Sequence, residues 1–413
     1  MTALPLRWRM VATGALALAL IGLAARPCQA NGFLIYDISG DALGRASAVT
    51  AAISEPAAIW FNPAALSFMK GVNASVGGTF ITARSRFSPT GGGPDTDSER
   101  GNFVLPAVFA SAPVSDRVAL GMGVYTTFGI GIRWPDDWAG SQNAIAASLE
   151  TLAFNPTVAV KVSRRFSLAA GFDAIRGAVD FTTGLPAIVG GDVRLVGGAW
   201  GYGFNVGALY RPLPQRVQVA LTYRSRVALH FDDGQADFRP AHVEFERQLP
   251  DQGGNAAITL PDMITAGVMV RPIEPLTLTF DANLVFWTTY QTIQINFQHA
   301  PARVLQPDGH DSYMLRLGAD LAPPRVPGLH FRMGLIFDRS AVRAEGLGPG
   351  LPDANRLDGA LGVGYGRGHL RADLGYLLVY FLPADAVGGR ESPEGTYRTL
   401  AHLLGLTVAA SWR

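Results

Sequence analysis

Arginine and aspartate recur along the C-terminal half of the chain at spacings that place them on one side of an extended strand. Arg316 and Asp320 are four residues apart, and Arg356 and Asp358 are two residues apart. Because side chains alternate between the two faces of a strand, each pair shares a face. Guanidinium groups bind carboxylates, so the pattern predicts ion pairs across an enclosed space or a site for a carboxylate ligand.

The basic residues are almost all arginines, since Lys70 and Lys161 are the only lysines among 34 basic residues. A cation that binds a ligand carboxylate is therefore predicted to be an arginine, although the sequence does not say which one. The 33 acidic residues leave a net charge of +1, which argues against the basic excess of a nucleic-acid-binding protein. A content of 48% hydrophobic and 16% charged residues also excludes a disordered chain.

Sequence motifs for catalysis, metals and cofactors are missing. The chain has no G-x-S-x-G or H-E-x-x-H motif, its seven histidines are scattered, and Cys28 is its only cysteine. The glycines of Gly362–Gly366 do not follow the G-x-G-x-x-G spacing of a nucleotide-binding loop. We therefore predict no metal, no cofactor and no enzyme activity. An outer-membrane lipase, which need not carry the G-x-S-x-G motif, remains an alternative.

Strict alternation of apolar and polar residues predicts an all-β protein. In residues 276–286 Leu276, Leu278, Phe280 and Leu284 occupy even positions, and polar residues lie between them. The same pattern predicts fourteen strands, at residues 72–86, 101–112, 117–130, 149–163, 166–180, 197–211, 215–231, 257–271, 275–298, 311–322, 328–340, 355–367, 369–382 and 397–412.

The links between these strands alternate between short turns and long loops. Ser163-Arg164-Arg165 and Arg367-Gly368 are examples of the short links, and residues 131–148 and 232–256 of the long ones. An even strand number, apolar alternation and this asymmetry are typical of a bacterial outer-membrane β-barrel. Such a sheet must close, because an open edge would leave backbone groups unsatisfied in hydrocarbon. We predict a 14-stranded antiparallel transmembrane barrel with both termini periplasmic; a soluble sandwich or propeller is the alternative.

Residues 1–30 are predicted to be a signal peptide. Arg7 and Arg9 precede an apolar run, Met10–Ala25, that ends near Cys28-Gln29-Ala30, and this run is shorter than the ~20 residues that span a bilayer. The mature chain would then begin at Asn31, have no cysteine, and be located in the outer membrane of a Gram-negative bacterium.

Charged residues on the strands should face the lumen, because a charge on the lipid side at the bilayer midplane costs about 2–4 kcal/mol. A lumen that carries both signs of charge predicts ion pairs inside the barrel. Among these residues Arg316 and Arg332 are the candidate ligand-binding cations. The full luminal set is Arg224, Arg226, Asp281, Arg316, Asp320, Arg332, Asp338, Arg356, Asp358, Arg371 and Asp373.

Residues 31–71 do not alternate and come before the first strand. They contain short apolar runs and helix formers, and they are too apolar for a free tail. A fourteen-stranded barrel is wider than an eight-stranded one, whose side chains already fill its interior. We therefore predict three regions: the signal peptide at residues 1–30, a hatch or plug inside the lumen at residues 31–71, and the barrel at residues 72–413.

This N-terminal region resembles the hatch of the FadL and TodX outer-membrane transporters. The resemblance rests on Gly32-Phe33, on Gly44-Arg45-Ala46 and on the run from Pro56 to Leu66, which contains Asn62-Pro63-Ala64. Further similar stretches are Leu260-Pro261-Asp262 and the segment from Leu351 to Arg356. The resemblance covers nearly the whole mature chain, and the fourteen strands of that family agree with the count from alternation.

The resemblance implies uptake of long-chain fatty acids or other hydrophobic molecules by a monomer, with the ligand and the outer-membrane lipid as its partners. In that family a ligand is captured by an extracellular loop groove, passes to a pocket near the hatch, and leaves sideways through a kinked strand. An aromatic-hydrocarbon transporter of the same family is the main alternative. A general diffusion porin is a further alternative, against which the plug argues.

The resemblance also implies site residues. Phe33 would lie near the pocket, Asn62, Pro63 and Ala64 beside the lateral opening, and Gly129 in the kinked third strand. Trp134 and Trp138 begin the loop that could supply the capture groove, but interfacial anchoring explains them equally well. The candidate ligand-binding residues are thus Phe33, Trp134, Trp138, Arg316 and Arg332, and the hatch and gating residues are Asn62, Pro63, Ala64 and Gly129.

Overall fold

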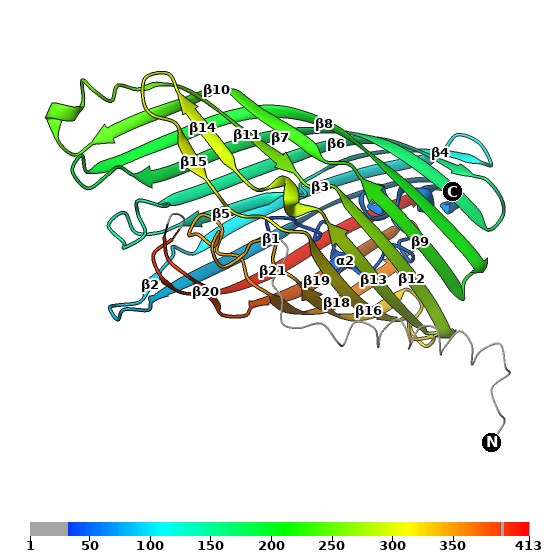
Figure 1. Cartoon of the computed structure of the whole chain (residues 1–413). Helices are drawn as coiled ribbons and strands as arrows, with labels where there is room; N and C mark the ends of the chain where they lie inside the picture. Colours follow the sequence, from blue (N-terminus) through cyan, green and yellow to red (C-terminus); the bar gives the residue numbers. More distant parts are fainter. Residues whose placement is uncertain (1–31, 390–391, 413) are drawn as a thin grey trace.

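Period-two alternation produces a sheet with one apolar and one polar face, and the structure closes this sheet into a barrel (Figure 1). The computed structural model describes residues 32–389 and 392–412, so the predicted signal peptide lies outside the described residues. The first strand, β1 (Val72–Pro89), pairs with the last, β21 (Gly395–Trp412), along its full length. This pairing joins the two ends of the sheet.

Fourteen antiparallel strands form the wall, as predicted. Four of them are divided by a break into β4 and β5, β9 and β10, β11 and β12, and β13 and β14, while β2, β15 and β20 are short additions near the loops. The remaining bounds are β2 (Thr96–Asp97), β3 (Gly101–Pro113), β4 (Val118–Tyr125), β5 (Gly129–Arg133), β6 (Ala146–Lys161), β7 (Phe166–Gly184), β8 (Gly191–Leu213), β9 (Val217–Arg224), β10 (Val227–Pro240), β11 (Gln252–Leu260), β12 (Met263–Ile273), β13 (Leu276–Val285), β14 (Ile293–Phe297), β15 (Arg303–Leu305), β16 (Ser312–Leu321), β17 (Leu329–Asp338), β18 (Arg356–Arg367), β19 (Leu370–Phe381) and β20 (Ala384–Ala386).

The predictions of single continuous strands at residues 117–130, 215–231, 257–271 and 275–298 are wrong. The first breaks between β4 and β5. The other three break between β9 and β10, between β11 and β12, and at the 3-10 helix η4 (Trp287–Thr289) between β13 and β14. These breaks lie at one level of the barrel, because Met263 at the start of β12 pairs with both Arg224 and Val285. Above this level β10, β11, β14 and β15 pair with one another, and we call these four strands the upper sheet.

The charged residues that were assigned to the lumen point inward with one exception, and large apolar side chains point outward. Arg316, Arg332 and Asp338 are at most 3% exposed, whereas Leu317 and Leu335 on the same strands are 54% and 64% exposed. Arg226 is the exception within that set. It lies in the break between β9 and β10, its side chain is 62% exposed, and it forms an ion pair with Asp262.

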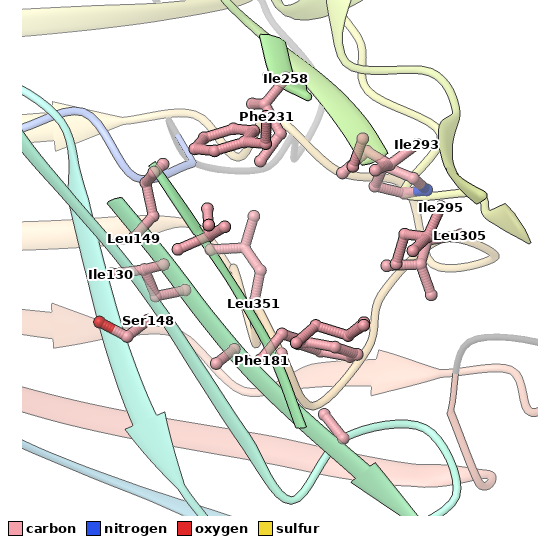
Figure 2. A pocket seen from close by; sticks show the side chains of 18 of the residues that line it. Ile130, Ser148, Leu149, Phe181, Phe231, Ile258, Ile293, Ile295, Leu305 and Leu351 are labelled. Atoms are coloured by element: carbon pink, nitrogen blue, oxygen red, sulfur yellow. The ribbon is translucent and has the colours of Figure 1, made fainter. Parts of the chain in front are cut away.

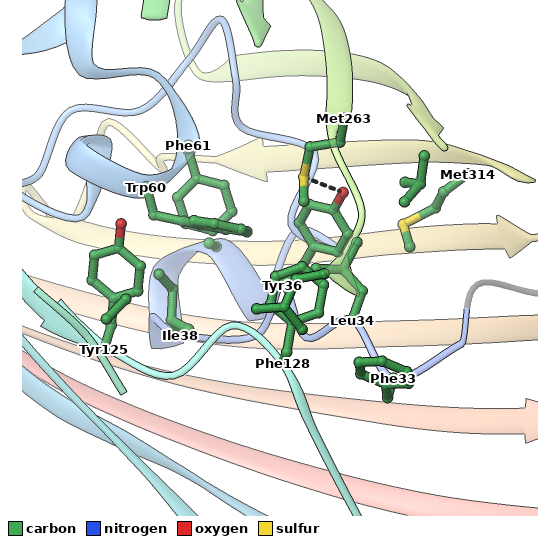
Figure 3. Packing of buried hydrophobic residues seen from close by; sticks show 14 of the residues in the cluster. Phe33, Leu34, Tyr36, Ile38, Trp60, Phe61, Tyr125, Phe128, Met263 and Met314 are labelled. Atoms are coloured by element: carbon green, nitrogen blue, oxygen red, sulfur yellow. Dashed lines mark hydrogen bonds between the residues drawn. The ribbon is translucent and has the colours of Figure 1, made fainter. Parts of the chain in front are cut away.

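The residues before β1, which we call the inner segment (residues 32–71), pack against the inward-facing side chains of the wall. They contain the helices α2 (Gly40–Leu43) and α3 (Ala58–Phe61) and the 3-10 helix η2 (Pro63–Phe68), whereas η3 (Val243–Phe245) lies in a loop. Figure 3 shows apolar side chains of this segment against the wall, including a hydrogen bond from Tyr36 to the sulfur of Met263. That the segment acts as a plug stays a prediction.

A buried network of charges attaches the inner segment to the wall. The guanidinium of Arg332 lies 2.7 Å from Asp41 of α2, 2.8 Å from Asp320 and 2.9 Å from Asp373. Asp41 also contacts Arg371, at 3.1 Å. One arginine therefore links α2 to three wall strands.

A close backbone approach permits this network. A Cβ atom at Gly44 would lie 2.9 Å from the Cα of Gly362 on β18, and one at Gly40 would lie 2.4 Å from the carbonyl oxygen of Asp373. Because glycine has no Cβ, α2 can lie directly on the wall backbone. Side chains as short as Asp41 can then reach the luminal arginines.

We predict that Arg332→Leu lowers the free energy of unfolding by about 3–5 kcal/mol, because three buried carboxylates lose a shared cation. The loss is measured as a fall in the temperature at which the folded barrel disappears on a gel. Arg84→Leu is the matched control, since Arg84 pairs with Asp97 at an exposed site, at 2.8 Å. The control should cost at most about 1 kcal/mol, and equal unfolding temperatures for the two variants would contradict the prediction.

Candidate functional site

The wall is interrupted between β3 and β5. β3 pairs with β4 only from Ala107 to Pro113, and its other half, Gly101–Pro106, pairs with β1 alone. β5 pairs with β6 and has no register with β3 in the described residues. Pro106 stands where the pairing with β4 ends, and proline has no N–H to extend a ladder.

The interruption is bounded at both ends. Below it, β3 and β4 pair from Ala107, opposite Tyr125. Above it, the backbone N–H of Glu99 donates to the carbonyl of Arg133 at 2.8 Å, and the two side chains form an ion pair at 3.3 Å. The gap is therefore a window in a closed wall.

The break between β4 and β5 pairs with the inner segment in place of β3. The N–H of Ile35 donates to the carbonyl of Thr127 at 2.8 Å, and the N–H of Gly129 donates to the carbonyl of Phe33 at 3.0 Å. Thr151 of β6 fixes the break from the other side, because its hydroxyl donates to the carbonyl of Phe128 and accepts from its N–H. The chain thus turns inward at residues 126–128 and keeps its backbone groups paired.

An apolar pocket of about 180 Å³ lies between the upper sheet and the strands β6, β7 and β8. Figure 2 shows side chains of both surfaces around it. Three parts of the loop between β17 and β18 complete the lining: Val342, the run Gly348–Leu351 and Gly346. The side chains labelled in the figure are Ile130, Ser148, Leu149, Phe181, Phe231, Ile258, Ile293, Ile295, Leu305 and Leu351.

A second cavity, of about 650 Å³, which we call the wall cavity, lies at the window. Its lining includes Ile81 and Ala83 of β1, whose positions face the lumen. It also includes Glu150 of β6 and Ala178 of β7, which lie on the outer face between buried neighbours. A cavity lined from both faces of the sheet crosses the wall.

Phe33 lies between the two cavities. Phe33, Ile130, Leu149 and Leu351 line both of them. The ring of Phe33 is 5% exposed and lies edge-on to Trp287, at 4.8 Å between ring centroids, and to Tyr290, at 5.4 Å. The ring of Phe33 is thus one of four side chains that the two cavities share.

Asp353 fixes the start of the inner segment. Its carboxylate accepts hydrogen bonds from the N–H of Gly32 at 3.1 Å, from the N–H of Ala341 at 2.8 Å and from the hydroxyl of Ser340. Burial raises the pKa of this carboxyl from its ordinary value to about 8. Asp353 is thus largely protonated at neutral pH.

The two tryptophans of the predicted capture loop lie behind the pocket. Trp134 is 0% exposed and Trp138 is 5% exposed, and the two rings stack at 4.6 Å. Neither is at the lipid face, so the alternative that they are interfacial anchors is wrong. Their indole N–H groups donate to the carbonyls of Pro349 and Ala144, and both of these residues line the pocket. Ligand contact by the tryptophans stays a prediction.

The two candidate arginines are occupied by other contacts. Arg332 serves the network described above, and Arg316 lies 3.5 Å from Asp281, donates to Asn283 and stacks on Tyr36 at 4.4 Å. Neither lines the apolar pocket or the wall cavity. These contacts attach the inner segment to the wall, and ligand binding by Arg316 and Arg332 stays a prediction.

The hatch motif lies at β8. Asn62 donates to the carbonyls of Thr50 and Ala208, at 3.1 and 3.2 Å, and accepts from the N–H of Ala64. Pro63 begins η2. None of the three residues of the motif lines the wall cavity, and their position beside a lateral opening stays a prediction. Gly129 does line that cavity.

Sequence reasoning missed several residues of the site. Phe103 points inward from β3 and covers Gly131, where a Cβ would lie 2.2 Å from its ring. Ile130 and Asp353 were also missed. The sequence did offer one signal for the window. Pro106 lies within an alternating strand, and a proline there indicates that hydrogen bonding to the neighbouring strand ends at that residue.

A closed barrel with apolar outer strands, an apolar pocket and a cavity through its wall defines a membrane channel for hydrophobic molecules. The chain belongs to the outer membrane protein transport family (OMPP1/FadL/TodX), whose model matches residues 21–387. It is therefore an outer-membrane transporter for hydrophobic compounds in a Gram-negative bacterium.

The chain is similar to relatives along most of its length. It is 26% identical to the long-chain fatty acid transport protein of Salmonella typhi, over 85% of this chain and 87% of that one. It is 24% identical to outer membrane protein P1 of Haemophilus influenzae, over 94% and 97%.

Solved structures share the fold. A Pseudomonas aeruginosa FadL homologue has a TM-score of 0.84 at 18% identity, covering 93% of this chain and all of that one. The toluene transporter TodX of P. putida has a TM-score of 0.70 at 15% identity, covering 94% and 100%.

We predict that the inner segment loosens as the pH rises from about 4 to about 8, because the pKa of Asp353 is 3.8 when the carboxyl is exposed and about 8 in its buried position. The folded-state pKa is raised, so the stabilisation is complete below about pH 4, falls by about tenfold per pH unit up to about pH 8, and is constant above that value. Hydrogen exchange of residues 33–38 at pH 6 and pH 9.5, corrected for the intrinsic rate, measures it. Asp353→Asn should remove the pH dependence, and an unchanged pH dependence in this variant would refute the prediction.

Proposed function

We propose that this protein takes up hydrophobic molecules by binding them in the apolar pocket and releasing them sideways into the membrane through the wall cavity. The single observation that carries the proposal is the shared lining of the two cavities at Phe33 and Leu149. A ligand that displaces the ring of Phe33 reaches the window between β3 and β5 without crossing the filled lumen.

The physical driving force is the transfer of apolar surface from one apolar environment to the next. Each buried CH₂ group contributes about 0.8 kcal/mol, so a long chain binds an apolar pocket without many polar contacts. A sideways exit delivers the molecule to hydrocarbon and avoids the aqueous periplasm. The buried ion pairs of the inner segment, which lie across the axial route, support this direction.

Long-chain fatty acids were the first expected ligands, and the names of several relatives agree with them. Aromatic hydrocarbons are the second candidate, which the apolar lining favours, because the described lining residues carry no charged side chain. The predictions that the protein is not an enzyme and acts as a monomer remain predictions.

The first test is the uptake of labelled oleate and labelled toluene by Gram-negative cells without their own transporter, with this protein confirmed in the outer membrane. We expect uptake of at least one of them to rise several-fold above cells with an empty vector. Failure of both, with a correctly inserted barrel, would refute the proposed function.

The second test blocks the wall cavity. Ala83→Trp places an indole in that cavity, and Ala83 does not line the apolar pocket. We predict that this variant binds ligand as the parent does but takes it up at least about tenfold more slowly, as expected of a blocked route. Ala170→Trp is the matched control, because Ala170 is an exposed position of β7 outside both cavities. Unchanged uptake by Ala83→Trp would exclude the lateral route.

A further inference from the structure

The apolar pocket is built without charge. None of its described lining residues is an aspartate, glutamate, lysine, arginine or histidine. Its polar members carry only amide or hydroxyl groups: Asn143, Ser148, Gln235, Asn255 and Tyr290. A carboxylate buried among them would lose its hydration and gain no counter-ion, which is unfavourable.

One guanidinium reaches the edge of the lining, that of Arg303 on β15. It lies 5.8 Å from the ring centroid of Phe181 and donates to the carbonyls of Gln142 and Asn143, at 2.9 and 3.2 Å. Its donors therefore tie the upper sheet to the loop between β5 and β6. These hydrogen bonds give Arg303 a structural role. Arg303 is also the arginine to test for binding of a ligand carboxylate.

The opposite side of the pocket wall is acidic. Gly234 and Gly254 face each other in the register of β10 and β11, and both line the pocket. The same two glycines line a second, polar cavity, so only backbone separates the two spaces at this point. That cavity is bordered by four acidic side chains and by no basic one among its described residues: Asp232, Asp233, Asp237 and Asp251. Their field disfavours a carboxylate in the pocket.

The wall cavity offers no clear anion site either. Arg356 is paired with Asp338, and Arg176 donates to the carbonyls of Gly177 and Ala199, both at 3.0 Å. Glu150, which lines the same cavity, carries a charge opposite to that of Arg176. A carboxylate on this route would therefore meet Arg356 already paired, and Arg176 in a lining that also contains an acidic residue.

We propose that the pocket selects lipophilic molecules without a negative charge, such as hydrocarbons and long-chain alcohols, and discriminates against carboxylates. The inference rests on the proposed function and names its ligand class. Specificity arises here from a penalty on the wrong ligand, because apolar contacts are the same for an alcohol and an acid of equal chain length. The fatty-acid expectation is thereby replaced for this chain.

The test compares 1-dodecanol with dodecanoate, which differ only at the head group. Equilibrium binding of each labelled probe is measured with the full-length protein in lipid nanodiscs at pH 8 and at pH 4.5, against empty nanodiscs. We expect dodecanol to bind at least about tenfold more tightly than dodecanoate at pH 8. The difference should shrink at pH 4.5, where the carboxylate of the probe is mostly protonated.

Two variants sharpen the result. Leu305→Lys adds a cation at a partly exposed lining position of β15 and should improve dodecanoate binding at pH 8 about tenfold, while Leu305→Gln, the matched control, should not. Arg303→Gln should leave the preference for dodecanol unchanged if the arginine is structural.

The outcomes separate the two proposals. Equal or tighter binding of dodecanoate at pH 8, lost in Arg303→Gln, would overturn the inference and make Arg303 the clamp, while the proposed function would stand. Equal binding that survives in Arg303→Gln would also overturn it. Binding of neither probe, with oleate and toluene uptake also absent, would overturn the proposed function and the inference together.

Discussion

The structure depends on the backbone hydrogen bonds of residues 126–129. At these residues, between β4 and β5, the chain no longer pairs with β3. Inside a bilayer an unpaired N–H or C=O group is costly, so a wall strand cannot simply stop pairing. Here the inner segment supplies the missing partner through Phe33 and Ile35. The same few bonds hold the window open, place Phe33 between the two cavities and fix the start of the inner segment. A change in the position of Phe33 is therefore coupled to the backbone of the window.

The remaining wall makes this arrangement rigid. Arg332 gathers Asp41, Asp320 and Asp373 in a buried cluster, and this cluster holds α2 against the wall. Such a cluster adds little to the free energy of unfolding compared with apolar residues of the same volume. Removal of one partner nevertheless lowers that free energy strongly, because the remaining charges stay buried without a counter-ion. The end of the inner segment that carries Phe33 is held differently, by three hydrogen bonds to the carboxyl of Asp353. One end is thus firmly anchored, and the other responds to protonation.

Charged side chains lie in the lumen and are kept out of the pocket. Luminal arginines and aspartates neutralise one another around the inner segment, and none of them reaches the apolar pocket, whose described lining is uncharged. The upper sheet makes this separation possible, because its strands lie above the breaks and bring Phe231, Ile258 and Ile293 over the pocket. A fold with the same wall and a cation in the pocket lining would favour another ligand class.

The sequence by itself determined the barrel, its strand number and the inward direction of all but one of the charged residues assigned to the lumen. These features follow from local alternation and from the cost of charge in lipid, which act on each strand separately. Only the tertiary structure decided the window, the break of three further strands at one level, and the site. Phe33, Ile130 and Leu351 are far apart in sequence and meet because the strands close into a ring. Arg316 and Arg332 looked free to bind a ligand because the sequence does not show their partners, Asp281 and Asp41, which lie 35 and 291 residues away. Long-range pairs of this kind form only when the chain folds, so a local pattern of alternation cannot show them.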